Sequence, residues 1–163
     1  MTVRDARQDE FADLAAVTLA AYRDLLGPAM DAGYAAELAD VDGRAGLVDL
    51  LVSVDEAGTV EGGVVYIPGP GPMAWFHGED EAGLRMLAVD PGAQGRGVGT
   101  ALVVACLARA AGAGKRRLLL HTTASMTAAR RLYERAGFRR DVEHDHLLAG
   151  GVALLAYVAD VGQ

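Results

Sequence analysis

The sequence contains one cysteine, no long apolar segment and a deficit of positive charge, and each shortage excludes a class of protein. Because Cys106 is the single cysteine among 163 residues, the chain has no internal disulfide framework, which is compatible with a reducing cytoplasm. The chain has no run of about 18 apolar residues that would predict a membrane span, and its amino terminus lacks the apolar core of a signal peptide. We therefore expect a soluble, cytoplasmic protein without a membrane partner.

The charge balance is acidic, with 15 Lys and Arg residues against 22 Asp and Glu residues and a formal net charge of −7. Proteins that bind nucleic acids need a basic face that neutralises phosphates, which this chain lacks overall. We therefore expect no nucleic-acid partner. The same balance favours a cationic partner or substrate.

A length of 163 residues fits one domain with a substantial core, and we expect residues 1–163 to form a single domain. The longest turn-rich stretch, residues 68–83, lies between two predicted strands. It is therefore interpreted as a surface loop and not as a domain boundary.

The hydrophobic pattern predicts a mixed α/β fold. Short apolar or β-branched runs predict strands, and apolar stripes at helical spacing predict helices. The first expected strand begins at residue 3. The others span 47–54, 60–67, 84–89, 118–122 and 152–158, with a further strand from residue 138 onward. The expected helices span 11–26, 34–38 and 97–111, with a last helix that has Ser125 as its N-cap. The helix at 97–111 lies between two strands, which predicts a βαβ unit.

A glycine-rich loop joins the predicted strand at 84–89 to the helix that follows it. The loop reads Gln94-Gly95-Arg96-Gly97-Val98-Gly99. The N-terminus of a helix presents unpaired N–H groups, and glycines let a ligand approach the backbone closely. The loop therefore predicts a phosphate-binding site.

This loop lacks the residues that two common nucleotide-binding motifs require. A dinucleotide fingerprint needs a glycine where Thr100 stands and an acidic residue about 20 positions later, where residues 118–124 contain none. A Walker A loop needs Lys followed by Ser or Thr after its last glycine, and Gly97 is followed by Val98-Gly99-Thr100. Neither nucleotide motif is present.

Three segments, in this order, resemble the GCN5-related N-acetyltransferases (GNAT family). They are Leu87-Ala88-Val89-Asp90-Pro91, the glycine loop, and Leu132-Tyr133-Glu134-Arg135-Ala136-Gly137-Phe138 after Met126-Thr127-Ala128-Ala129. The resemblance covers about residues 84–140. It implies the acyl-CoA N-acyltransferase fold, a mixed α/β fold with a central, mostly antiparallel twisted sheet flanked by helices. It also implies an enzyme that moves an acetyl group from acetyl-coenzyme A (acetyl-CoA) to a primary amine by direct attack, the amine belonging to a small molecule or a protein.

The resemblance assigns the cofactor to a loop and a strand. The loop would bind the pyrophosphate, to which Arg96 would add a charge-assisted hydrogen bond. The main chain of the strand before the loop would pair with the pantetheine arm, in the manner of an added strand. The implied cofactor-binding residues are Leu87, Ala88, Val89, Gln94, Gly95, Arg96, Gly97, Val98, Gly99 and Thr100.

The resemblance also implies two catalytic groups. The N–H of Leu87 would point at the thioester carbonyl and stabilise the oxyanion of the tetrahedral intermediate. Tyr133 matches the family tyrosine that protonates the departing thiolate, and a phenol with a pKa near 10 can donate to a thiolate whose conjugate acid has a pKa of about 8.5. Tyr133 also lies on the apolar stripe of its helix, so a packing role stays open.

The base that removes the proton from the amine is not assigned by these motifs. Many family members carry a glutamate four residues before the position of Leu87, where this chain has Gly83. Glu81 is the first choice, because it lies two residues earlier and on the same face if the strand extends that far. A water chain to a distant carboxylate and the following residues are further candidates: His77, Glu79, Asp80 and His121.

Two alternatives complete the predictions. His144-Asp145-His146 beside Glu143 offers metal-ligating side chains, but a charged hairpin tip gives the same residues and no second cluster completes a site, so no metal is expected. The absence of a glutamate at position 83 leaves open a non-catalytic sensor or regulatory module that binds acyl-CoA. The sequence leaves the oligomeric state open, including a homodimer.

Overall fold

The computed structural model describes residues 1–162, which fall into two compact units. The first unit comprises Met1–Tyr66 and Met86–Ala105. The second comprises Ile67–Arg85 and the chain from Cys106 onward. The elements β4 and α4 contribute residues to both units, and the last residue of β3, Ile67, also belongs to the second unit.

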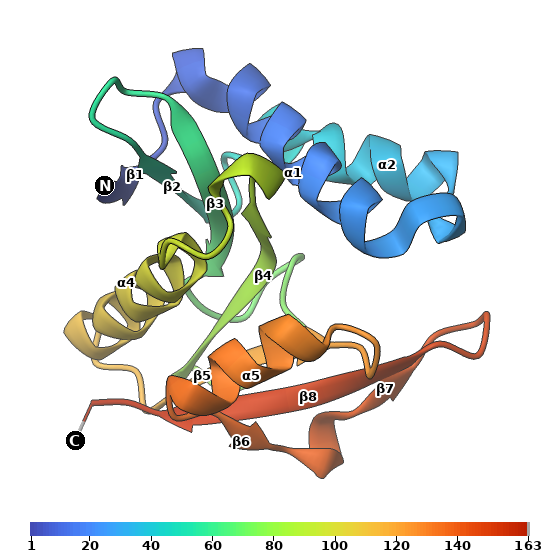
Figure 1. Ribbon diagram of the computed structural model, residues 1–163. Coiled ribbons are helices and arrows are strands. Elements are labelled where there is room, and N and C mark those ends of the chain that lie inside the picture. The colour runs from blue at the N-terminus through green and yellow to red at the C-terminus, as the bar shows by residue number, and fades with distance from the viewer. Residues whose placement is uncertain (163) are drawn as a thin grey trace. The chain divides into compact units, whose positions relative to one another are not determined.

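The first unit contains two complete strands, all but the last residue of a third strand, and the second half of β4 (Figure 1). Its elements are β1 (Thr2–Asp5), η1 (Gln8–Glu10), α1 (Phe11–Leu26), η2 (Gly27–Ala29), α2 (Ala32–Ala39), α3 (Val41–Arg44), β2 (Asp49–Val54), β3 (Val60–Ile67) and η3 (Pro91–Ala93). The strand order is β1-β2-β3-β4, and both β1 and β3 run antiparallel to β2. The strands predicted at 47–54 and 60–67 are present as β2 and β3, with β2 beginning at Asp49.

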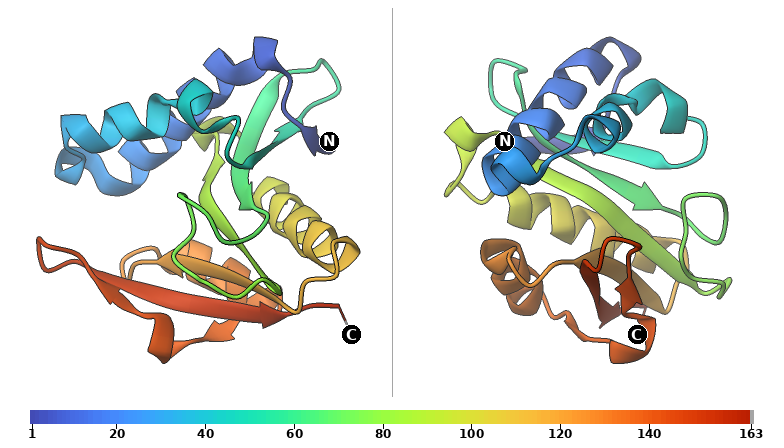
Figure 2. Two further views of the ribbon diagram at one scale, coloured as in Figure 1. Left: turned by 180° about the vertical axis from the view of Figure 1, so that it is seen from behind. Right: turned by 90° about the vertical axis from the view of Figure 1, so that its right-hand side faces the viewer.

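Helices α1 and α4 cover opposite faces of β3 (Figure 2). A Cβ on Gly63 would collide with Leu14 of α1, whereas one on Gly62 would lie 2.9 Å from Val98 Cγ1 and 3.2 Å from Leu102 Cδ1 of α4. Successive residues of a strand point to opposite faces, so the two glycines serve different helices. Their missing side chains let both helices approach the sheet closely.

The second unit is built on the first half of β4 and on the strands after α4. Its elements are β4 (Glu81–Val89), α4 (Val98–Gly112), β5 (Arg117–Thr122), α5 (Thr127–Arg135), β6 (Arg139–Arg140), η4 (Val142–His144), β7 (His146–Leu147) and β8 (Ala153–Asp160). The order is β4-β5-β8-β6, with β7 also on β8. Only β4 and β5 pair in parallel here, which confirms the predicted βαβ unit. The predicted fold class is confirmed: a mixed α/β fold with a mostly antiparallel sheet flanked by helices.

Some predicted boundaries were wrong. The N-cap of α5 is Met126 and not Ser125, because the N–H of Met126 already bonds to the Thr123 carbonyl in a turn. The hydroxyl of Ser125 lies 3.0 Å from that of Thr123. The short elements η4 and β7 lie between the strand predicted from residue 138 onward and the one predicted at 152–158. Within residues 1–162, no helix is both long enough and apolar enough to cross a membrane.

Candidate functional site

Two left-handed glycines shape the loop between β4 and α4. Gly95 and Gly97 have φ angles of +79° and +81°. Among residues 1–162, no atom beyond each glycine and its two chain neighbours lies within 4 Å of the position that a Cβ would occupy. Residues with a Cβ rarely adopt this conformation, which explains why the loop contains glycines. Their backbone is open to a ligand.

The loop ends in the N-terminus of α4, a helix of 15 residues. The N–H of Ala101 donates to the Gly97 carbonyl at 3.0 Å, and the N–H groups of the residues before it precede the first helical hydrogen bonds. Residues 94–97 and Thr100 are exposed. Exposed N–H donors at the positive end of a helix bind anions, so this loop fits a pyrophosphate.

Glu61 of β3 supports this loop from the adjacent strand. Its carbonyl accepts the N–H of Asp90 at 2.8 Å, and its carboxylate Oε1 lies 3.4 Å from Arg96 Nη2. The Glu61 side chain is 10% exposed and that of Arg96 is 62% exposed. Arg96 Nη2 also donates to the Gly92 carbonyl at 3.4 Å. The guanidinium is therefore tethered at the base of the loop.

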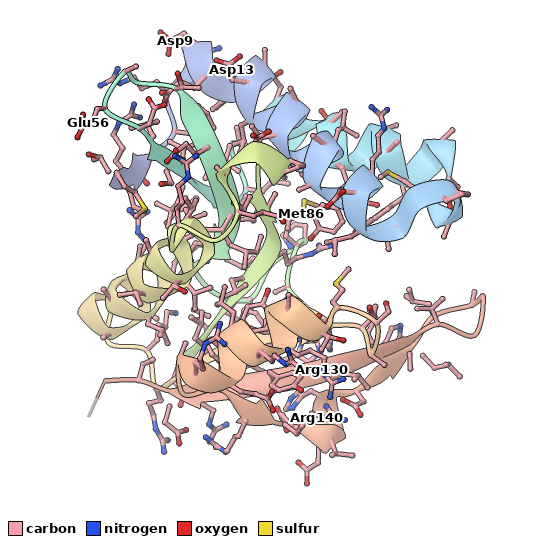
Figure 3. The ribbon with its side chains drawn as sticks, in the orientation of Figure 1. Asp9, Asp13, Glu56, Met86, Arg130 and Arg140 are labelled. Atoms are coloured by element: carbon pink, nitrogen blue, oxygen red, sulfur yellow. The ribbon has the colours of Figure 1, made fainter. Side chains whose placement is uncertain are left out.

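Strand β4 contains a backbone irregularity that the sequence did not predict. Met86, labelled in Figure 3, has a φ of +54° and lies immediately before Leu87. It is the single residue other than glycine with a positive φ among residues 1–162. Methionine has no preference for a positive φ, so the amino-acid sequence gives no sign of this irregularity. Burial along β4 still alternates from residue to residue between Leu84 and Val89.

Tyr133 of α5 lies in the core of the second unit. It is 5% exposed, and its ring packs edge-on against Phe138 with centroids 5.8 Å apart. Burial raises the pKa of its hydroxyl above the ordinary value of 10, and Cys106 adds to this shift. The hydroxyl makes no hydrogen bond to residues 1–162. Tyr133 therefore packs in this core, and its role as a proton donor stays a prediction.

Glu81 has structural partners at the start of β4. The carboxylate is buried, accepts the N–H of Gly78 at 3.2 Å and lies 3.4 Å from Arg117 Nη1. Arg117 is its neighbour in the ladder with β5. Six residues of strand, about 20 Å of extended chain, separate Glu81 from Leu87. The predicted extension of the strand to Glu81 is correct, but this geometry favours a structural role, and its role as a base stays a prediction.

The other candidate bases have different surroundings. His77 and Glu79 are exposed in the loop before β4, and Asp80 Oδ2 lies 3.5 Å from Arg116 Nη1. His121 of β5 is partly buried, and its ring lies 4.7 Å from that of Trp75.

Two of the residues considered for a metal site, His144 and Asp145, pair with neighbouring side chains. His144 Nδ1 lies 2.6 Å from Asp141 Oδ2, and Asp145 accepts two hydrogen bonds from Arg140 at 2.7 Å. Among residues 1–162, no group of three His, Cys, Asp or Glu side chains gathers in metal-binding geometry.

Comparison with known proteins identifies the family. The model of the acetyltransferase (GNAT) family matches residues 14–138. The chain belongs to the GNAT family. A GNAT enzyme from Kribbella flavida has the same fold, with 26% identity, a TM-score of 0.72 and coverage of 98% of this chain and 97% of that one. A GNAT acetyltransferase from Staphylococcus aureus Mu50 is 13% identical with a TM-score of 0.76, and each chain is covered over 98% of its length.

Curated relatives of this GNAT protein match over a shorter segment. A mycothiol acetyltransferase of Cellulomonas flavigena is 43% identical over 63 residues, which is 39% of this chain and 18% of that protein. The corresponding protein of Geodermatophilus obscurus is 47% identical over 55 residues, 34% of this chain and 18% of that protein. The chain thus spans about a fifth of the length of these relatives.

Proposed function

We propose that this protein is an enzyme that transfers the acetyl group of acetyl-CoA to an amine. The observation that carries the proposal is the pair of left-handed glycines, Gly95 and Gly97, directly before the N-terminus of α4. These residues form an anion site with an open backbone, which matches the pyrophosphate of coenzyme A. Membership of the GNAT family supports this choice over other phosphate compounds.

The cofactor would be held mainly by main-chain groups. Residues 94–100 would donate N–H groups to the pyrophosphate, with a charge-assisted bond from Arg96. The main chain of residues 87–89 would pair with the pantetheine arm. When bound, acetyl-CoA supplies an activated thioester carbonyl, and the N–H of Leu87 would stabilise the negative charge that develops on its oxygen.

Tyr133 would supply the proton for the leaving group. Its hydroxyl is free of hydrogen bonds to residues 1–162 and burial raises its pKa, so it stays protonated over the physiological pH range. Proton donation to the departing sulfur lets coenzyme A leave as a neutral thiol and not as a thiolate. The mechanism needs no covalent intermediate with the enzyme.

The acceptor would be a primary amine of a small molecule or a protein. The formal charge of −7 favours a cationic acceptor, because an acidic surface attracts cations. We also propose that residues 1–163 act as one domain, since β4 and α4 run through both units. A single cooperative unfolding transition would support this, whereas two separate transitions would contradict it.

The test is the release of free thiol from acetyl-CoA with a panel of amines, comprising diamines, polyamines and lysine-containing peptides. Amine-dependent release supports the enzyme. A non-catalytic acyl-CoA module is the second candidate, because no glutamate stands at Gly83. Tight binding of acetyl-CoA without thiol release from any amine would favour that module.

A further inference from the structure

His121 lies where β5 continues beyond its pairing with β4. The parallel ladder ends at Gly83 opposite Leu119. His121 stands two residues further along β5 and pairs with Ala156 of β8. Within residues 1–162, this part of β5 is therefore paired with β8 along one edge and with no strand along the other.

The hydrogen bonding of His121 defines its tautomer. Nε2 lies 2.7 Å from the carbonyl oxygen of His144. A carbonyl oxygen only accepts hydrogen bonds, so Nε2 carries the proton and Nδ1 of the neutral ring has the lone pair. Nδ1 has no hydrogen-bond partner among residues 1–162. The ring thus presents an unoccupied proton acceptor on a fixed scaffold.

Trp75, in the loop that precedes β4, holds this ring in place. The two rings lie 4.7 Å apart and are inclined by 35°. Phe76 contacts Trp75 edge-on at 5.5 Å. The indole Nε1 is buried without a partner in the described chain. The stack and the bond to His144 fix the imidazole from two directions, as a catalytic group requires.

The surroundings keep His121 neutral. Burial lowers the pKa of its imidazole and is the largest influence. The effects of the neighbouring groups on this pKa partly cancel. The hydrogen bond to the His144 carbonyl and the charge of Asp145 raise the pKa, whereas the charges of His146 and His144 lower it. Asp145 is itself paired with Arg140. A neutral imidazole at pH 7 can accept a proton.

We propose that His121 is the general base, with Nδ1 accepting the proton of the acceptor amine. This inference rests on the proposed acetyl transfer. The amine nitrogen forms a bond to the thioester carbonyl carbon as the C–S bond breaks. The nitrogen loses its extra proton to Nδ1, and the thiolate takes a proton from the hydroxyl of Tyr133. One amine and one thioester thus give one amide and one thiol, and exchange with water then removes the proton from His121 and returns one to Tyr133. Unlike Glu81, His121 has an acceptor atom without a partner.

The test is His121→Gln, in which the amide nitrogen can still donate to the His144 carbonyl while the base is removed. We expect kcat/KM to fall at least 100-fold at pH 7, with the affinity for acetyl-CoA unchanged. The activity of His121→Gln should recover as the pH rises, because hydroxide can then remove the proton that Nδ1 accepts in the wild type. Asp24→Asn, at an exposed position of α1, is the control and should behave as the wild type.

The outcomes separate the two proposals. An active wild type whose kcat/KM is unaffected by His121→Gln would overturn the base and leave acetyl transfer intact. A His121→Gln variant that is folded and binds acetyl-CoA, but loses activity equally at every pH, would also overturn it. A wild type that releases no thiol with any amine would overturn both proposals.

Discussion

The carboxylate of Glu61 lies 3.4 Å from the guanidinium of Arg96, and this pair links β3 to the glycine loop. Because the carboxylate is almost fully buried and the guanidinium is mostly exposed, the two residues depend on the pair unequally. Glu61 needs a cation to offset its desolvation, whereas Arg96 keeps most of its hydration. Stability and cofactor binding should therefore respond differently to changes at the two positions.

The first prediction separates these effects with Arg96→Ala and the double variant Glu61→Gln/Arg96→Ala. Arg96→Ala leaves a buried carboxylate unpaired, and we expect a loss of about 1 kcal/mol in the free energy of unfolding. The double variant should recover most of this loss. Both should bind acetyl-CoA about tenfold more weakly, since about 1.4 kcal/mol of charge-assisted binding is lost. Denaturant unfolding and calorimetric titration measure the two quantities. A double variant no more stable than Arg96→Ala would show that the Glu61–Arg96 pair does not contribute to the free energy of unfolding.

The second prediction concerns the left-handed glycines. Gly97→Ala should lower the free energy of unfolding by about 1 kcal/mol through backbone strain. Gly58 has a φ of +83° and the same open surroundings, so Gly58→Ala is a matched control with a similar cost. Only Gly97→Ala should weaken the binding of acetyl-CoA. Equal affinities of the two variants would remove the loop from the cofactor site.

The third prediction is that Tyr133→Phe lowers turnover with little change in the affinity for acetyl-CoA. The hydroxyl that it removes has no partner in residues 1–162, so the cost in stability should be small. Tyr157→Phe is the control, because that hydroxyl accepts a hydrogen bond from Arg130 Nε at 3.1 Å and its loss should affect stability more than turnover. Figure 3 labels Arg130 on α5. Unchanged turnover of Tyr133→Phe in a thiol-release assay would exclude it as the proton donor.

The fourth prediction links stability to pH through Glu10. Two hydrogen bonds from Arg4, both of 2.8 Å, are the main cause that lowers the pKa of Glu10 to about 2, and the N–H of Arg7 contributes. Because the folded-state pKa is depressed, the stabilisation is present at neutral pH and is lost as the pH falls from 4.5 towards 2. Wild type should exceed Glu10→Gln by about 1 kcal/mol at pH 7, since partial exposure of Arg4 screens the pair.

Denaturant unfolding at a series of pH values measures this difference. The difference in the free energy of unfolding should shrink as the pH falls below 4.5 and should vanish near pH 2. Asp9→Asn is the control for the removal of one carboxylate at an exposed position beside Glu10. A gap between wild type and Glu10→Gln that stays constant with pH would contradict the assignment.

Much of the fold could be predicted from local patterns. The β3 strand has the predicted bounds, and α1 and α4 match within a residue, because apolar periodicity and glycine stops act within each segment. Boundaries that depend on pairing were harder. β4 begins three residues before the predicted Leu84 because Glu81 pairs with Arg117, a residue distant in the chain. The N-cap prediction at Ser125 was wrong because a preceding turn already binds the N–H of Met126.

The sequence by itself determined the glycine loop, the order of the elements and the family. Positive φ angles, helix starts and strand runs depend on neighbouring residues, and glycine is the residue that tolerates the loop geometry. Only the tertiary structure decided which side chains remain available for chemistry. The carboxylate of Glu81 is paired with Arg117. Trp75 and His144 orient the ring of His121, whose Nδ1 has no hydrogen-bond partner within the described chain. These partners are far apart in sequence, so only folding brings them together.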